Sequence, residues 1–151
     1  MKLLIVDDEK LTREGILKTL PLEKLGIHQT FLADDGIHGL KIALKEKPDL
    51  ILTDVRMPRM SGVEMAEEIL KSLPNAIILF MSAYSDKEYL KAAIKLKAVS
   101  YVDKPLDMNE LTEALAEGIH QYRSMYTSLN AQWMHEGNLR SQLAQLLTET
   151  D

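Results

Sequence analysis

The sequence contains no cysteine, and only five prolines, seven glycines and a few aromatic side chains interrupt its 151 residues. Without cysteine, disulfide bonds and thiolate metal sites are excluded. No apolar run approaches the roughly 20 residues that a membrane-spanning helix requires, and Met1-Lys2 leads directly into an apolar run rather than into a signal peptide. We therefore expect a soluble, cytoplasmic protein without a membrane partner.

The overall composition is that of an ordinary globular domain. Hydrophobic residues make up 46% of the chain and charged residues 27%, and this length suits one domain with a short appendage. The formal net charge of −5 disfavours a nonspecific nucleic-acid surface. We expect no nucleic acid to bind to this segment itself.

Short continuous apolar runs alternate with helical patterns along the chain. Runs of this kind are typical of strands that are buried on both faces of a sheet. They occupy residues 3–6, 50–53, 77–81 and 99–102, and a weaker run at 30–33 fits a further strand. Five strand-then-helix units predict an α/β fold with a doubly wound, five-stranded parallel sheet.

Apolar residues at spacings of three and four mark the helices between these runs. The predicted buried stripes are Ile37, Leu40 and Leu44; Ala66, Ile69, Leu70 and Leu73; and Leu90, Ala93 and Ile94. The last helix continues its stripe from Leu111 to Trp133, and the pattern resumes from Leu139 to Leu147. We expect this extension to meet a surface outside the domain. The alternative is a frayed tail whose pattern is accidental.

Three of the apolar runs end at charged residues. The first meets Asp7-Asp8-Glu9, the third meets Asp54, and the last meets Asp103-Lys104. The carboxyl ends of parallel strands meet at one edge of a sheet, where open α/β folds bind ligands. Carboxylates so close together repel one another unless a hard divalent cation lies among them. The sequence therefore predicts a magnesium and phosphate site.

The acidic residues suggest a partial magnesium shell. One carboxylate of the Asp7-Asp8 pair could bind directly and the other through water, with Asp54 and a backbone carbonyl completing the protein ligands. The alternative is that Asp7-Asp8-Glu9 caps the first helix. A carboxylate that a cation keeps ionised can attack phosphorus, so Asp54 is the candidate nucleophile.

Other polar residues at the same edge could hold a phosphoryl group. The Lys104 ammonium could offset its charge, although a solvated strand end is the alternative, and the Lys104-Pro105 bond could be cis or trans. The Ser82 hydroxyl could donate to a phosphate oxygen. Tyr101, three residues before Lys104, is either a core residue or a partly exposed switch.

Residues 1 to about 120 resemble the receiver domain of two-component response regulators. The motifs that carry the resemblance are Leu4-Ile5-Val6-Asp7-Asp8-Glu9, Leu52 to Pro58 with Met60-Ser61-Gly62, Met81-Ser82-Ala83-Tyr84, and Tyr101-Val102-Asp103-Lys104-Pro105. The resemblance implies a flavodoxin-like sheet of strand order 2-1-3-4-5 with an extended C-terminal helix. It divides the chain into a receiver domain, 1–121, and a helical linker or coiled-coil extension, 122–151.

The resemblance also implies a metal and a partner. It implies that Asp54 accepts a phosphoryl group from a sensor histidine kinase, and that the chain is no enzyme beyond its self-catalysed phosphorylation and dephosphorylation. Mg²⁺ would be bound by Asp8 and Asp54, by Asp7 through water, and by the backbone carbonyl of Arg56. Ser82 and Lys104 would hold the phosphoryl oxygens.

The signal would be transmitted through a conformational change. The resemblance implies that Ser82 and Tyr101 form the switch, and that the surface from roughly Lys87 to Ala116 changes shape and mediates a homodimer, alone or with the C-terminal helix. The connection 21–26 and the helical extension resemble regulators with an AraC-type helix-turn-helix pair, so we expect a DNA-binding output domain outside this chain. The alternative is a stand-alone receiver with a dimerising tail.

Two positions depart from the family pattern, and two other classes compete with it. Lys97 stands where the family often has glycine, and Asp103 adds an acid beside Lys104 that could tune dephosphorylation.

A magnesium-dependent aspartyl phosphatase of the haloacid-dehalogenase type needs an acid two residues after the nucleophile, where this chain has Arg56. A flavin-binding module is excluded by the acidic first loop.

Overall fold

A computed structural model describes residues 1–93, 99–125 and 127. Its centre is a five-stranded sheet of order β2-β1-β3-β4-β5, in which every neighbouring pair is parallel. The strands are β1 (Lys2–Val6), β2 (Gln29–Ala33), β3 (Leu50–Asp54), β4 (Ile77–Ser82) and β5 (Val99–Asp103). This topology confirms the predicted flavodoxin-like fold.

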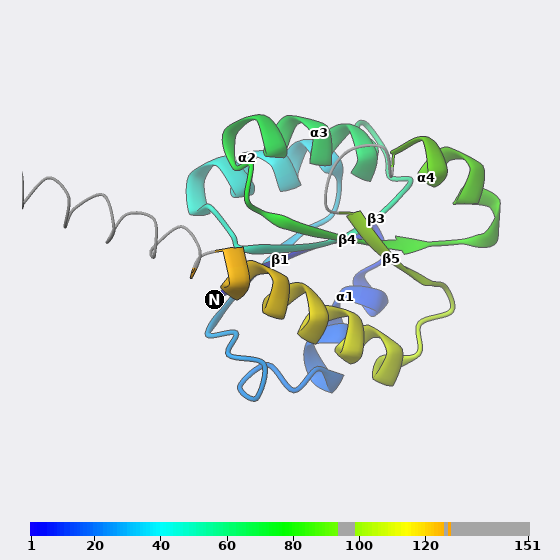
Figure 1. Ribbon diagram of the computed structural model, residues 1–151. Coiled ribbons are helices and arrows are strands. Elements are labelled where there is room, and N and C mark those ends of the chain that lie inside the picture. The colour runs from blue at the N-terminus through cyan, green and yellow to red at the C-terminus, as the bar shows by residue number, and fades with distance from the viewer. Residues whose placement is uncertain (94–98, 126, 128–151) are drawn as a thin grey trace, which may run out of the picture. The chain divides into compact units, whose positions relative to one another are not determined.

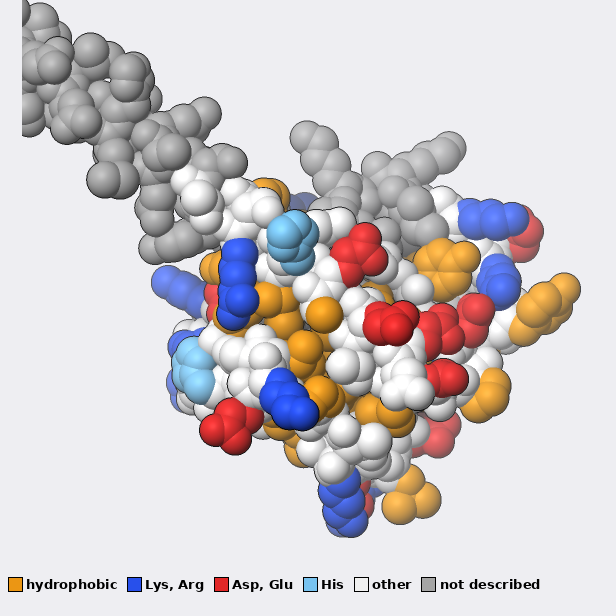
Figure 2. Space-filling view, turned by 60° about the horizontal axis from the view of Figure 1, so that its bottom comes forward, with side chains coloured by type: hydrophobic (Ala, Val, Ile, Leu, Met, Phe, Trp, Pro, Cys, Tyr) orange, Lys and Arg blue, Asp and Glu red, His pale blue; other side chains and the backbone are white. Residues whose placement is uncertain are grey.

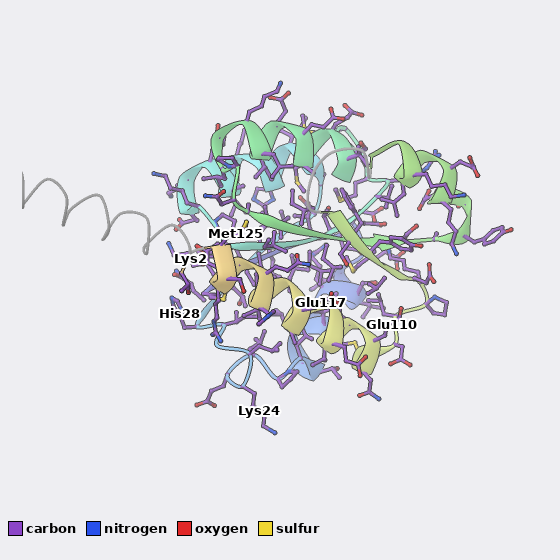
Figure 3. All side chains as sticks on the ribbon, viewed as in Figure 1. Lys2, Lys24, His28, Glu110, Glu117 and Met125 are labelled. Carbon is purple, nitrogen blue, oxygen red and sulfur yellow. The ribbon has the colours of Figure 1, made fainter. Side chains whose placement is uncertain are left out.

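Helices cover both faces of the sheet, as Figure 1 shows. The described helices are α1 (Lys10–Thr19), α2 (Gly36–Glu46), α3 (Gly62–Ser72), the 3₁₀ turn η1 (Tyr84–Asp86), α4 (Lys87–Ala93) and a C-terminal helix over residues 108–125. Helices α2 and α3 lie on one face, and α1 with the start of the C-terminal helix lies on the other (Figure 1). Glu110 and Glu117 lie on the outer, exposed side of that helix (Figure 3).

The chain divides into two compact units, Met1–Ile119 and His120–Asp151. The boundary between residues 121 and 122 stays a prediction, and most of the expected extension lies outside the described residues, as does Lys97. Over the described parts of the chain, no helix combines the length and the apolar character needed to cross a membrane.

Strands β3 and β4 are completely buried because helices cover both of their faces. All residues of β3 and β4 are buried, including the polar side chains of Thr53, Asp54 and Ser82. The C-terminal helix packs through Leu111, Leu115 and Ile119. Each fully buried aliphatic side chain contributes about 1.5–3 kcal/mol to the core. The site at the end of these strands therefore stands on a rigid base.

Three strands extend one residue further at their carboxyl ends than predicted. The ladder pairs Asp54 with Met81 and Ser82 with Asp103, so β3, β4 and β5 end on polar residues instead of just before them. These strands continue one position beyond the apolar runs because a polar side chain at the sheet edge does not break the backbone pairing. Asp54 and Ser82 are consequently fixed in the sheet rather than in loops.

The predicted buried stripe of α2 is wrong at Leu44, whereas Leu40 packs against the core as predicted. Leu44 is exposed, and the buried residues of this helix are Gly36, Gly39 and Ala43. A Cβ atom on Gly39 would lie 2.6 Å from the sulfur of Met65 on α3. Helix α2 therefore approaches its neighbours so closely that small residues face the core, and the larger apolar residues are displaced toward its flanks.

Candidate metal and phosphoryl site

Three carboxylates converge at the carboxyl edge of the sheet. Asp7 and Asp8 follow β1, and Asp54 ends the neighbouring strand β3. One oxygen atom from each of the three carboxylates lies within 4.8 Å of the other two. Asp7 and Asp54 are buried and Asp8 is exposed. The structure thus brings together the three acids that the sequence singled out.

Lys104 bridges two of these carboxylates. Its ammonium nitrogen lies 3.1 Å from Asp54 Oδ2 and 3.2 Å from Asp7 Oδ2. The Lys104 backbone N–H donates to the Ser82 carbonyl at 2.8 Å, which fixes the start of the loop after β5. A lysine whose side chain is only 22% exposed and contacts two acids is no solvated strand end.

Burial and charge shift the ionisation of this cluster. Burial raises the pKa of Asp54; Lys104 opposes the shift, and the negative charge of Asp7 adds to it. Burial alone would lower the pKa of Lys104, but attraction by Asp54 and Asp7 outweighs it, so that pKa is raised. Lys104 therefore remains a cation at neutral pH, and an ionised Asp54 is held at a free-energy cost.

The loop after β1 is shaped around Asp7. The Asp7 carboxylate accepts a hydrogen bond from the Glu9 N–H at 2.8 Å, and Arg13 donates from α1 to the Asp7 carbonyl at 2.5 Å. Helix α1 begins after Glu9, whose side chain makes no capping hydrogen bond. The alternative that these acids cap the first helix is therefore not supported.

The loop after β3 folds back tightly onto Asp54. The Asp54 carboxylate accepts from the Val55 N–H at 2.9 Å, and the Gly62 N–H donates to the Val55 carbonyl at 2.8 Å. A Cβ atom on Gly62 would lie 1.9 Å from the Asp54 carbonyl oxygen, so only glycine permits this approach. The Arg56 carbonyl belongs to this constrained loop, two residues after Asp54.

The remaining predicted residues are placed as follows. Ser82 is buried at the end of β4, and its hydroxyl donates to the Ala83 carbonyl at 3.1 Å. Tyr101 is 44% exposed, which rules out its alternative as a core residue. Asp103 contacts the Lys87 ammonium at 3.6 Å, so it pairs with α4 outside the carboxylate cluster. The Lys104-Pro105 bond is cis.

Sequence reasoning missed several residues that shape the site. Arg13 carries no pattern that would have marked it. Asp86 is a buried acid of η1 that pairs with Arg56 at 2.7 Å, and its position four residues after the end of β4 was a usable signal. Asp35, the N-cap of α2, accepts a hydrogen bond from the His38 N–H and also binds Arg59 in the loop before α3; the His38 bond first and the Arg59 contact second lower the pKa of Asp35.

A groove of about 420 Å³ opens beside Lys104. Its walls are α1, including Leu11, Gly15 and Ile16, and the segment 104–108. Figure 2 turns the face of α1 and the C-terminal helix toward the viewer and shows hydrophobic side chains across the middle of this face, with acidic side chains mostly on the right. The sequence patterns did not predict this groove, because residues of two distant segments form it.

The donor set fits a hard divalent cation. Asp7, Asp8 and Asp54 together carry three negative charges when ionised, and Lys104 neutralises only one of them. All available ligand atoms are oxygens, which Mg²⁺ prefers, and Mg²⁺ commonly binds through few carboxylates while retaining several waters. The residues present therefore fit magnesium.

Comparison with known proteins gives a consistent result. The family model "response regulator receiver domain" matches residues 3–116. An uncharacterised response regulatory protein of Staphylococcus epidermidis is 38% identical over 114 residues, which cover 76% of this chain and 45% of the relative. The transcriptional regulatory protein HptR of Staphylococcus aureus is 37% identical over 110 residues, which cover 73% of this chain and 43% of HptR. The chain thus spans less than half the length of these curated relatives.

Solved structures agree. A two-component transcriptional regulator AraC from Clostridium phytofermentans is 51% identical, with a TM-score of 0.79 and coverage of 82% of this chain and 96% of that one. The receiver domain of AraT, a response regulator from Geobacillus stearothermophilus, is 30% identical, with a TM-score of 0.78 and coverage of 83% and 97%. From its fold, its acidic pocket and these matches, the chain belongs to the receiver-domain family of two-component response regulators.

Proposed function

We propose that this chain is a phosphorylation-dependent switch in which Asp54 accepts a phosphoryl group from a sensor histidine kinase. The observation that carries the proposal is the placement of Asp54. Its carboxylate is buried at the end of β3, among two further acids and within 3.1 Å of the Lys104 ammonium. Receiver domains of two-component regulators are signalling proteins, and this geometry supplies the acceptor that such a protein requires.

The transfer needs positioning and charge neutralisation more than covalent chemistry. A carboxylate oxygen of Asp54 forms a bond to phosphorus while the phosphorus–nitrogen bond of the donor histidine breaks and its electron pair stays on the imidazole nitrogen. Asp7, Asp8, Asp54 and the Arg56 carbonyl would hold Mg²⁺, which neutralises charge on the phosphoryl group when bound. Lys104 and Ser82 would hold phosphoryl oxygens.

We infer that the kinase approaches over the groove beside Lys104. A donor histidine can reach Asp54 only from the carboxyl edge of the sheet, because helices cover both faces of β3. The groove between α1 and the segment 104–108 adjoins that edge and carries the exposed side chain of Leu11. Such an apolar surface suits a protein partner.

Ser82 and Tyr101 are the proposed switch. Tyr101 is partly exposed on β5, so its ring has freedom to turn inward if Ser82 moves toward the phosphoryl group. The surface between Lys87 and Ala116 would then change and favour a homodimer, alone or with the C-terminal helix. The names and lengths of the relatives support a transcriptional role, in which this receiver controls a DNA-binding output domain of a longer protein.

The test is incubation of the purified chain with acetyl phosphate and Mg²⁺. Intact-mass spectrometry should record one phosphoryl group per chain, and sedimentation should record a change of association state after treatment with beryllofluoride. A magnesium-dependent phosphatase would instead release inorganic phosphate continuously in amounts far above one equivalent. That result, or the absence of any labelling, would refute the switch.

An Asp8→Asn variant should bind Mg²⁺ about tenfold or more weakly, a loss of about 1.4 kcal/mol or more, because an uncharged amide replaces a charged ligand. Asp8 is exposed, so the free energy of unfolding in the absence of Mg²⁺ should change by less than about 0.5 kcal/mol. Calorimetric titration measures the affinity. Asp103→Asn is the matched control at the same edge of the sheet, and equal affinities in the two variants would remove Asp8 from the metal site.

A further inference from the structure

An ion pair joins the loop after Asp54 to the 3₁₀ turn η1. Arg56 Nε lies 2.7 Å from Asp86 Oδ1. The Arg56 side chain is 66% exposed, whereas that of Asp86 is only 6% exposed. The buried member of the pair is thus the acid, and the exposed arginine reaches back to it from the loop between β3 and α3.

Asp86 is a fixed anchor. It lies in η1, and its backbone N–H donates to the Ala83 carbonyl at 3.0 Å, directly after β4. The next residue, Lys87, contacts Asp103 at the end of β5 at 3.6 Å. Asp86 is therefore attached to the segment directly after β4, and the guanidinium of Arg56 is attached to Asp86.

We propose that Asp86 is a positioning residue for the metal site, acting through Arg56. The Arg56 carbonyl is a ligand in the proposed function, on which this inference rests, and the same residue's side chain is held by Asp86. Because a side chain anchored at one end restricts the backbone at the other, the ion pair limits the rotation of the peptide that follows Arg56. Asp86 thereby orients the Arg56 carbonyl without contacting it.

Coupling of this kind is reciprocal. If the Arg56–Asp86 ion pair makes the loop more favourable for the cation, then loading of the site with Mg²⁺ and beryllofluoride must favour that ion pair by the same free energy. Amide hydrogen exchange of the peptide that spans residues 84–88 should slow on loading in the wild-type protein. The slowing should disappear in a variant without the ion pair, while protection around Asp54 persists.

Two variants separate positioning from simple electrostatics. Removal of a nearby cation by Arg56→Gln would by charge alone strengthen Mg²⁺ binding, and removal of an anion by Asp86→Asn would weaken it. A positioning role predicts that both variants, and the double variant, bind Mg²⁺ about tenfold more weakly than the wild type. This factor is the lower end of the range seen when a residue that orients a metal ligand is removed. Because the two residues act as one unit, the double variant should be no weaker than either single variant.

The measurements are calorimetric titration of the full chain with Mg²⁺ and thermal unfolding without Mg²⁺. Glu88→Gln is the control, because this exposed residue of α4 has the same charge as Asp86 and pairs with Lys91 instead of the loop. Arg56→Lys tests the same pair with the charge retained, and it should recover part of the affinity. A stronger or unchanged Mg²⁺ affinity in Arg56→Gln, or a lowered melting temperature without a change in affinity, would overturn the proposal.

The same experiment distinguishes this failure from failure of the proposed function. If the wild-type chain neither binds Mg²⁺ nor becomes labelled on Asp54, the proposed function fails and this inference fails with it. If the wild-type chain binds and is labelled, but the Arg56 and Asp86 variants behave like Glu88→Gln, only the positioning role is refuted.

Discussion

An Asp54→Asn variant is expected to lose phosphoryl labelling completely while its folded state becomes more stable than that of the wild type. The loss follows because an amide oxygen cannot serve as the nucleophile that forms the bond to phosphorus. The gain in stability follows from the cost of burying this carboxylate, since burial and the charge of Asp7 outweigh the attraction of Lys104 and raise the Asp54 pKa.

The pH dependence of this gain has a definite sign. Because the Asp54 pKa is higher in the folded than in the unfolded chain, the folded state binds more protons between the two values. The contribution of Asp54 to stability is therefore present at pH values below the unfolded pKa of 3.8 and is lost as the pH rises through the raised folded pKa. The free energy of unfolding of Asp54→Asn should exceed that of the wild type at neutral pH and equal it at acid pH.

Two measurements check these outcomes. Intact-mass spectrometry after treatment with acetyl phosphate follows the labelling, and urea unfolding without Mg²⁺, at neutral and acid pH, follows the stability. Asp34→Asn changes an exposed acid outside the cluster and should leave the labelling intact. Stoichiometric labelling of Asp54→Asn would refute the assignment of the acceptor, and a loss of stability at neutral pH would contradict the ionisation argument.

A Lys104→Met variant should be destabilised by about 3 kcal/mol without Mg²⁺, the lower end of the cost of removing one partner from a buried ion pair. Methionine retains most of the side-chain volume but leaves Asp7 and Asp54 without their cation. Unlike most destabilising variants, this one should bind Mg²⁺ more tightly than the wild type, because a competing positive charge is absent.

Mg²⁺ should therefore restore part of the stability lost in Lys104→Met, by mass action. Labelling by acetyl phosphate should nevertheless be slower, because Lys104 would no longer hold a phosphoryl oxygen. Lys91→Met, which changes a lysine exposed on α4, is the control and should behave like the wild type in each measurement. Weaker Mg²⁺ binding in Lys104→Met would show that the lysine supports the metal site instead of competing with the cation.

The pattern of apolar runs along the sequence was enough to predict the sheet and the position of the carboxylate cluster. The runs around Leu4, Ile51 and Ile78 are continuous because helices cover both faces of their strands, and that pattern is sufficient for a parallel sheet. Asp7 and Asp54 follow two of these runs, Lys104 follows the apolar run of the edge strand β5, and a parallel sheet necessarily gathers its strand ends at one edge. Convergence of the pocket residues could therefore be predicted without coordinates.

Tertiary structure decided the features that depend on distances between particular side chains. The buried face of α2 belongs to Gly36, Gly39 and Ala43, because the loop before α3 approaches too closely for a larger residue at Gly36 and α3 itself at Gly39. Asp86 and Arg56 meet although they are 30 residues apart. A sequence period reports which residues share a face of one element, whereas the separation of two elements depends on how every side chain between them packs, and only the folded chain contains that information.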